Sequence, residues 1–238
     1  MLTVGIINHN LGKYLGAAIE SAIPEAGRVI VFDDGSTDKS LDVCKEFKQF
    51  DVEVVSRETA SGSAAWGWNE LIAMCETKYF LPLSADDVLV KGAGKRIIEQ
   101  DADWIYADLD LIDVAGNKIA YYDYKNWPKT VDDCIRYMWF YKKLWPTMIA
   151  AFRTDFVRDN GLNAWNFEGM SSFMDTSTGI SWLFANPELC YLGEPIIQYR
   201  QHPQSETLNS CVIDRKVMER KLENYIIEKS SLLKGDRK

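Results

Sequence analysis

Residues 29–38 read Val-Ile-Val-Phe-Asp-Asp-Gly-Ser-Thr-Asp, and this stretch decides the fold. Its β-branched and aromatic run predicts a buried strand that ends at Asp33 and Asp34, followed by a glycine turn. Ser36 or Thr37 as the N-cap of a following helix would explain the turn. An N-cap does not explain two adjacent carboxylates, because their repulsion and their desolvation both cost free energy. Open α/β sheets bind ligands at the carboxyl ends of their strands, so the stretch indicates a ligand site.

The segments around this strand alternate between strand and helix periodicity, which predicts an α/β fold with a parallel sheet. Strands are predicted at residues 2–7, 28–32, 52–55, 79–83 and 104–107, and helices at residues 11–23, 39–50 and 64–75. Two further strands, Leu109–Val114 and Lys118–Tyr122, flank a hairpin turn at Ala115-Gly116-Asn117. Residues 123–170 are rich in Trp, Tyr and Met, and we expect them to pack as a cap over the sheet edge.

The composition narrows the class of protein. The 238 residues carry a net charge of −8 without the basic stripe of a nucleic-acid groove. The five cysteines include no Cys-x-x-Cys pair, which favours reduced thiols. No basic segment followed by a long apolar run begins the chain, and no apolar stretch approaches the roughly 18 residues of a spanning helix. We therefore expect a cytoplasmic protein that binds no nucleic acid.

The C-terminal residues differ in charge from the rest of the chain. Residues 212–238 hold eight basic and five acidic residues, and Val212–Leu233 reads as a terminal helix. Basic residues close to an anionic membrane contribute ~1 kcal/mol each, so this helix is a candidate for peripheral contact with the inner face of a membrane. A solvated helix packed on the domain is the alternative. Sedimentation with phosphatidylglycerol vesicles at low salt would distinguish the two.

A second group of acids follows the strand at residues 79–83. Parallel order brings Ser84-Ala85-Asp86-Asp87 to the same sheet edge as Asp33 and Asp34. Carboxylates there suit a hard divalent cation shared with a substrate phosphate. A capping box from Ser84 to Asp87 is the alternative, but it leaves Asp86 unexplained. Asp86 is therefore the predicted metal ligand, and the pair Asp108 and Asp110, after another strand, ranks second.

Other phosphate-binding patterns do not match. Gly92-Ala93-Gly94-Lys95 is rich in glycine but lacks the spacing and the Ser or Thr of a P-loop. No Gly-x-Gly-x-x-Gly follows the first strand, which argues against a dinucleotide site.

Eight segments, taken in order along the chain, carry a resemblance to a known family. They are Ile6–Asn10, Val31–Asp38, Gly62–Asn69, Leu83–Asp87, Ile105–Gly116, Gly161–Asn163, Met174-Asp175 and Glu194–His202. Together they resemble the inverting nucleotide-sugar glycosyltransferases of family 2, which have the GT-A fold. The resemblance implies a Rossmann-like, mostly parallel sheet flanked by helices, with a C-terminal acceptor-side region and a terminal helix.

The same resemblance implies how the chain is divided. Residues 1–210 would form a single GT-A domain, with a nucleotide-sugar half at about 1–115 and an acceptor half at about 116–210. Residues 211–238 would be a helical extension. Two replacements depart from the family pattern. Ser84 stands where the first Asp of the Asp-x-Asp motif is usual, and Met174 stands where a Glu precedes the catalytic Asp.

Roles for individual residues also follow from the resemblance. The residues implied to bind the nucleotide-sugar are Asn8, His9, Asp33, Asp34, Asn69 and Asp87. Asp86 and His202 would hold Mg²⁺ or Mn²⁺, and Asp175 would be the general base, with Glu168 as its nearest rival. A structural histidine is the alternative for His9, and an exposed loop histidine is the alternative for His202. An N-cap is the alternative for Asp175.

The tryptophans divide into two expected groups. Trp66 and Trp68 lie in the third predicted helix, where we expect them to be core residues. Trp139, Trp145 and Trp165 lie in the aromatic-rich region, where they would stack on acceptor sugars or only pack the cap.

The function implied is transfer of a sugar, with inversion, from a UDP-sugar to a glycan, lipid-linked or other hydroxyl acceptor. A GT-A domain that binds nucleotide-sugar or glycan without turnover is the alternative. A sugar nucleotidyltransferase would need a loop rich in glycine and arginine after the first strand, and Asn8–Lys13 does not supply one.

Overall fold

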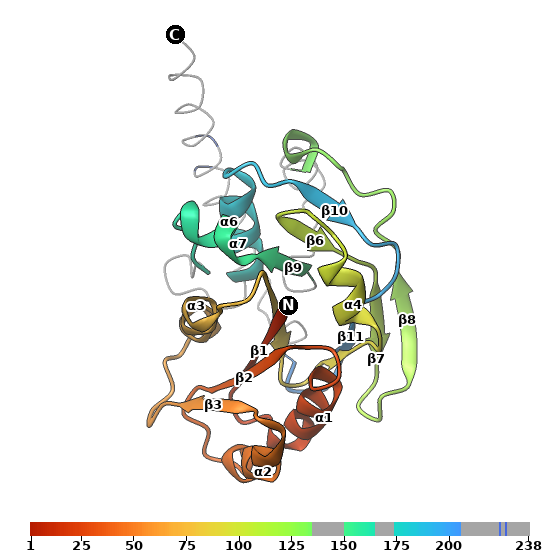
Figure 1. Cartoon of the computed structure of the whole chain (residues 1–238). Coiled ribbons are helices and arrows are strands. Elements are labelled where there is room, and N and C mark those ends of the chain that lie inside the picture. The colour runs from red at the N-terminus through yellow and green to blue at the C-terminus, as the bar shows by residue number, and fades with distance from the viewer. Residues whose placement is uncertain (135–149, 165–173, 206–223, 225–226, 228–238) are drawn as a thin grey trace.

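The computed structural model describes residues 1–134, 150–164, 174–205, 224 and 227, and Figure 1 shows two sheets with helices around them. The larger sheet has seven strands in the order β10-β6-β9-β4-β1-β2-β3. Their bounds are β1 Leu2–Asn8, β2 Arg28–Asp33, β3 Glu53–Ser56, β4 Tyr79–Ser84, β6 Trp104–Tyr106, β9 Ala150–Arg153 and β10 Leu189–Tyr191. All neighbours are parallel except β9, which is antiparallel to β4 and β6. The predicted mostly parallel α/β sheet is therefore confirmed.

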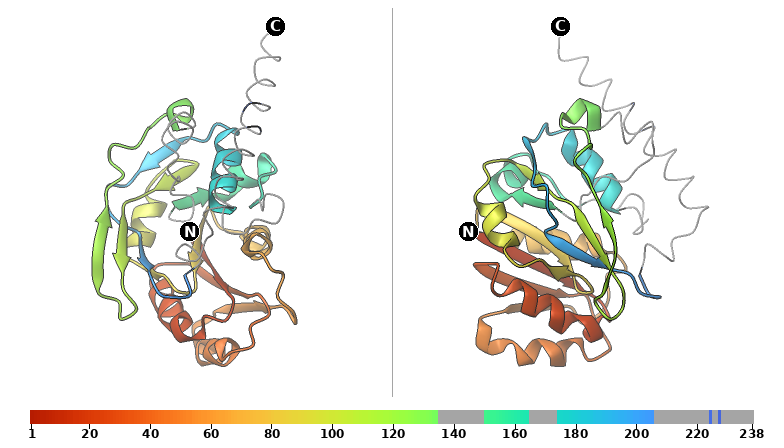
Figure 2. Two further views of the ribbon diagram at one scale, coloured as in Figure 1. Left: turned by 180° about the vertical axis from the view of Figure 1, so that it is seen from behind. Right: turned by 90° about the vertical axis from the view of Figure 1, so that its right-hand side faces the viewer.

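Helices cover both faces of this sheet because its central strands are apolar on both faces. Val4 and Ile6 of β1 pack with α1 (Gly12–Ala22), and α2 (Ser40–Glu46) lies beside α1 (Figure 2). Ile30 and Phe32 of β2 face the other way and pack against α3 (Ala64–Met74). Successive side chains of a strand point to opposite faces of the sheet. One short apolar run therefore contributes side chains to the core beside α1 and to the core beside α3.

A second sheet of four strands has the order β5-β11-β7-β8. Its strands are β5 Val88–Leu89, β7 Leu109–Ile112, β8 Lys118–Tyr122 and β11 Ile197–Arg200. The antiparallel pair β7 and β8 is the predicted hairpin. Strand β11 returns from late in the chain to lie between β5 and β7. This pairing brings the segment at residue 200 next to the turn after β4.

One sequence prediction is corrected, and one alternative is excluded. Residues 150–153 were expected in a cap, but they form β9 inside the main sheet, where Ala150, Ala151 and Phe152 are buried. Four residues are too few to show the alternation of a strand, so the hydrophobic pattern did not predict β9. The capping box at Ser84, which was the alternative to a metal site, is excluded because a turn and strand β5 follow Ser84. The next helix, α4 (Ala93–Ile98), starts later, after Gly92.

The remaining differences are smaller. The helix predicted at 39–50 divides into α2 and a 3₁₀ turn at Lys48–Phe50, which ends at Asp51 with φ 58°. Helices α4 and α6 (Thr154–Asp159) were not predicted, whereas the helix expected at Asp175 is observed as α7 (Met174–Leu183). Several predicted features lie outside the described residues. They are Trp139, Trp145, Trp165, Glu168 and nearly all of the predicted terminal helix. No helix in the described ranges is both long and apolar enough to cross a membrane.

Candidate active site

The carboxyl ends of three neighbouring strands carry the predicted site. Asn8 at the end of β1 pairs with Asp33 at the end of β2. On the other side of β1, Ile7 pairs with Ser84 at the end of β4. The two acidic motifs therefore flank the end of β1, as parallel order predicts.

Asp33 holds the loop that follows β2. Its carboxylate accepts from the Asn8 amide (Nδ2 to Oδ2, 2.7 Å) and from the Ser36 main-chain N–H (3.0 Å). The same Asn8 amide donates to Ser36 Oγ at 3.0 Å. Asp33 is fully buried and Asn8 is almost so. In this structure both residues therefore have internal contacts, and Asp34 beside them is buried as well.

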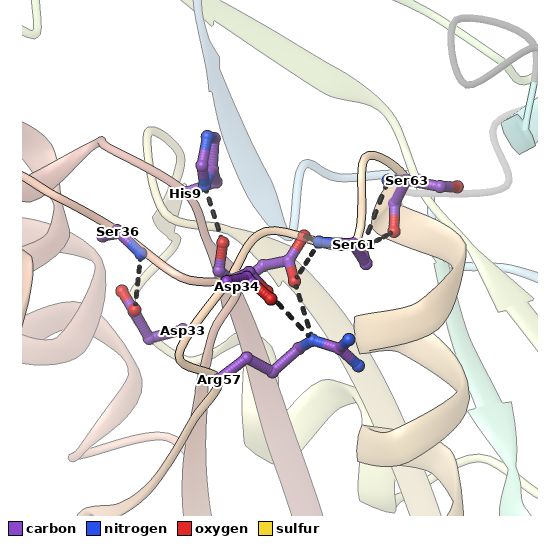
Figure 3. Close-up of polar contacts among 8 residues, drawn as sticks. His9, Asp33, Asp34, Ser36, Arg57, Ser61 and Ser63 are labelled. Carbon is purple, nitrogen blue, oxygen red and sulfur yellow. Dashed lines mark hydrogen bonds and ion pairs between the residues drawn. The ribbon is translucent and has the colours of Figure 1, made fainter.

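Asp34 is tied to the loop that precedes α3 (Figure 3). Ser61 donates to its carboxylate through the main-chain N–H (2.9 Å to Oδ1) and through the hydroxyl (2.7 Å to Oδ2). Arg57 Nε lies 3.5 Å from Asp34 Oδ1, so the buried carboxylate has a cation beside it. The loop comes this close only because residue 35 is glycine. Gly35 has φ +66°, and a Cβ there would lie 2.4 Å from the main-chain nitrogen of Ala60.

His9 is exposed, yet its ring is held in one orientation. The Nδ1–H donates to the Asp34 carbonyl at 2.7 Å, since a carbonyl oxygen only accepts. The Asn10 amide then donates to Nε2 at 3.1 Å. The imidazole therefore stands beside Asp34 as the Nδ1–H tautomer.

Trp66 corrects a sequence prediction. Trp68 is in the core as expected, but Trp66 is 56% exposed. The Arg57 guanidinium lies 5.6 Å from the centre of the Trp66 ring. An exposed aromatic face with a cation over it therefore adjoins Asp34. Arg57 was not predicted as a site residue, although it directly follows β3 and so lies on the same carboxyl edge.

Asp86 and His202 meet at the end of β4. Asp86 Oδ2 lies 2.9 Å from His202 Nε2, and the His202 side chain is buried. The Gln204 main-chain N–H donates to His202 Nδ1 at 3.3 Å, so the ring proton is on Nε2 and points at Asp86. The Asp86 carboxylate suits a hard cation such as Mg²⁺ or Mn²⁺. His202 suits one as a ligand only after its proton moves to Nδ1.

Asp87 and Asn69 have mainly internal contacts in this structure. Asp87 is buried, and its Oδ1 accepts from the Arg200 main-chain N–H at 2.8 Å. The Asn69 amide bonds both main-chain groups of Ala164, at 2.7 and 3.1 Å. Asn69 thereby fastens the segment that follows α6 to helix α3.

The second-ranked acidic pair has other partners. Asp108 is buried and accepts from the hydroxyls of Tyr121 and Tyr191 and from the Tyr124 main-chain N–H. Asp110 pairs with Lys118 at 2.5 Å. Among the described residues no three Asp, Glu, His or Cys side chains gather as a metal cluster.

Asp175 is the second residue of α7, so within this helix it is not the N-cap. The far end of the helix is anchored in the core. Trp182 is buried, and its indole N–H donates to the Asn163 carbonyl at 2.9 Å. The Asp175 side chain lies outside the described part of the chain.

Comparison with known proteins agrees with this fold. The profile of glycosyl transferase family 2 matches residues 3–145, more than half of the chain. The chain therefore belongs to glycosyltransferase family 2, and its mostly parallel sheet is that of the GT-A fold.

Individual curated relatives share about a quarter to a third of the aligned residues with this chain, over about half of its length. The chain is 26% identical over 130 residues to the glycosyltransferase GlyG of Streptococcus pneumoniae, over 51% of this chain and 43% of GlyG. It is 34% identical over 117 residues to the succinoglycan biosynthesis protein ExoU of Rhizobium meliloti, over 47% of this chain and 34% of ExoU. It thus spans less than half of either curated relative.

Solved structures share the fold. Residues 1–349 of S. aureus TarS in complex with UDP superpose with a TM-score of 0.64 at 20% identity, over 85% of this chain and 61% of that one. The complex of the same TarS fragment with UDP-GlcNAc gives 0.66 at 17% identity, over 89% and 61%. The mannosyltransferase PcManGT of Pyrobaculum calidifontis, in complex with GDP-Man and Mn²⁺, gives 0.54 at 12% identity, over 80% and 54%.

Proposed function

We propose that this domain binds a UDP-sugar at the carboxyl edge of the main sheet and transfers the sugar, with inversion, to a hydroxyl of a glycan or lipid-linked acceptor. The observation that carries the proposal is the placement of Asp34 and Asp86 on either side of strand β1, in a chain of family 2. The S. aureus relative of the same fold is known in complex with UDP and with UDP-GlcNAc, which supports the choice of nucleotide.

The base of the nucleotide would lie at the Asp34 end of the site. Asp34 can accept from a pyrimidine N–H or a ribose hydroxyl, and the exposed faces of His9 and Trp66 adjoin it. Stacking of a base on an aromatic ring is worth about 1–3 kcal/mol. Arg57 lies 3.5 Å from the Asp34 carboxylate and also contacts the Trp66 ring, so it belongs to the same subsite. Asn8 and Asp33 would support this end from below, and Asn69 from helix α3.

The diphosphate would lie at the Asp86 end. Asp86 would hold Mg²⁺ or Mn²⁺, with His202 as its hydrogen-bond donor or, in the other tautomer, as a second ligand. A bound ion of this kind would offset the charge that develops on the departing nucleoside diphosphate. Asp87 follows Asp86 and would lie on the sugar side.

Asp175 would be the general base. It would take the proton from the acceptor hydroxyl while that oxygen attacks the anomeric carbon from the face opposite the diphosphate. One displacement then breaks the bond to the diphosphate and inverts the anomeric centre. A domain that binds nucleotide-sugar without turnover is the second candidate, and Ser84 and Met174, which depart from the family motifs, favour it.

Calorimetry of UDP binding, in Mn²⁺ and in EDTA, tests the two ends separately. We expect Asp86→Ala to remove the gain in affinity from Mn²⁺ and to leave the affinity in EDTA unchanged. Trp66→Ala should weaken binding about equally in both buffers, because the base contact does not depend on the cation. Equal affinity of wild type and Asp86→Ala in Mn²⁺ would exclude Asp86 as a metal ligand. Release of UDP from UDP-sugars by the wild type would then distinguish the enzyme from the binding domain.

A further inference from the structure

Arg200 is a buried arginine whose partners are main-chain carbonyls. Its Nε donates to the Asp86 carbonyl at 2.8 Å, and its Nη1 donates to the Asp113 carbonyl at 3.1 Å. Its own main-chain N–H donates to Asp87 Oδ1 at 2.8 Å. None of the ion pairs found among the described residues includes Arg200, which is 6% exposed. Burial of a guanidinium costs free energy, and no ion pair within the described part of the chain offsets that cost. We therefore expect the role of Arg200 to lie in the groups that it contacts.

Tyr14 of helix α1 links Arg200 to the second member of the predicted metal pair. The Arg200 guanidinium carbon lies 5.3 Å from the centre of the Tyr14 ring. The His202 ring centre lies 4.8 Å from the same ring, at an interplanar angle of 35°. Tyr14 is itself 8% exposed and fixed in the core side of α1. One aromatic ring therefore contacts both Arg200, the last residue of β11, and His202, two residues further along the chain.

We propose that Arg200 and Tyr14 are positioning residues for the Asp86–His202 pair. The inference rests on the proposed function, which places a divalent cation at Asp86. Arg200 fixes the main chain of Asp86 directly and the imidazole of His202 through Tyr14. The same guanidinium holds the β7–β8 turn at Asp113 against the pair.

The chemistry of the side chain explains why arginine is needed. The guanidinium is a planar fork that donates in two fixed directions, toward the Asp86 and Asp113 carbonyls. A lysine ammonium carries the same charge on a flexible stem and cannot hold both carbonyls in one geometry. Residues that orient a metal ligand typically contribute about 10–100-fold to metal affinity or activity.

The first test needs no ligand. The chain has two histidines, so the imidazole ¹⁵N spectrum of the full protein contains two sets of signals. We expect the Nδ1–H tautomer for His9 and the Nε2–H tautomer for His202. In Arg200→Lys the His202 signals should move or show both tautomers, while the His9 signals stay in place. Unchanged His202 signals would overturn the proposal.

Arg28→Lys is the matched control. Arg28 also donates to a main-chain carbonyl, that of Met74 at 2.6 Å, but it lies at the opposite end of β2 from the site. The control should lower the melting temperature through weaker contacts with the Met74 carbonyl and with Glu53, and it should leave both histidines unchanged. Tyr14→Phe should behave like the wild type because it keeps the ring, and Tyr14→Leu should behave like Arg200→Lys.

The second test is UDP calorimetry in Mn²⁺ and in EDTA. We expect Arg200→Lys to reduce the gain in affinity from Mn²⁺ by roughly 10-fold or more, with the affinity in EDTA unchanged. An equal loss in both buffers would mean that Arg200 contacts the nucleotide itself, and it would overturn the positioning role. A wild type that shows no gain from Mn²⁺ would instead refute the cation at Asp86, before any substitution is considered.

Discussion

Gly35 is the residue on which the proposed base end of the candidate site depends most directly. Its φ of +66° costs an L-residue about 1–2 kcal/mol, and a Cβ would also meet the main chain of Ala60 at 2.4 Å. We expect Gly35→Ala to lower the melting temperature by about 2–4 °C for each kcal/mol lost. It should also weaken UDP binding, because the loop that carries Ser61 must move away from Asp34. Thermal unfolding and calorimetry measure the two effects.

Gly62 provides a matched control for this prediction. Its φ is +76°, but a Cβ there would have nothing within 4 Å. Gly62→Ala should therefore lose stability through the backbone conformation alone. If the two variants lost equal stability and bound UDP equally well, the close approach at Gly35 would have no role.

At the scale of elements, strands and helices with a clear period were predictable. The run at residues 29–32 alternates between two cores, and hydrophobicity alone marks it as buried on both faces. The antiparallel strand β9 was not predictable, because Ala150 and Ala151 carry no strand preference and only sheet neighbours give them a place. Strand β5 was not predictable either, because two residues are too few to show a strand pattern.

The placement of the candidate site residues was predictable where residue type and strand end coincide. Asp34 and Asp86 followed from the rule that parallel strands share a carboxyl edge. Trp66 was predicted in the core together with Trp68 because both lie in the third predicted helix, whereas only Trp68 is buried and Trp66 lies toward solvent. Arg200 and Tyr14 were not assigned a role, since their contact joins elements almost the whole chain apart and no local pattern encodes it.

Helix α7 carries the element-scale prediction. Its position is set by buried Trp182, so its first turn, with Asp175, is held relative to the core. We expect Asp175→Asn to keep the melting temperature and the UDP affinity but to lower turnover by ~10²–10⁴-fold, because an amide cannot take the acceptor proton. Turnover is measured with the donor that gives the largest thermal shift.

Asp155→Asn controls for the loss of charge at a helix start. Asp155 is likewise the second residue of its helix, α6, and is exposed. Either substitution removes a favourable charge near a helix N-terminus, worth about 0.3–1 kcal/mol. Only Asp175→Asn should lose turnover, and wild-type turnover in that variant would exclude Asp175 as the base.

At the scale of the whole molecule, Asp108 joins the two sheets. It lies where the chain leaves β6 for β7, and it accepts from Tyr191 of the main sheet (2.5 Å) and from Tyr121 of the second sheet. The hydrogen bond to Asp108 raises the pKa of Tyr121 to about 12. Burial, followed by the same carboxylate, raises the pKa of Tyr191 as well. Each phenol donates to Asp108 only while it is protonated, so both hydrogen bonds depend on pH.

This linkage predicts a loss of stability at alkaline pH. The pKa of a tyrosine in the unfolded chain is about 10, so the contribution of the Tyr121 hydrogen bond to stability is complete below that pH. It falls as the pH rises toward about 12, since the unfolded chain releases the proton first. Urea unfolding between pH 8 and 11 should show this fall, and Tyr121→Phe should reduce it. Tyr122→Phe, at an exposed neighbour on the same strand, should leave it unchanged. If both variants kept the full pH dependence, the titration of Tyr121 would not be the cause of the loss of stability.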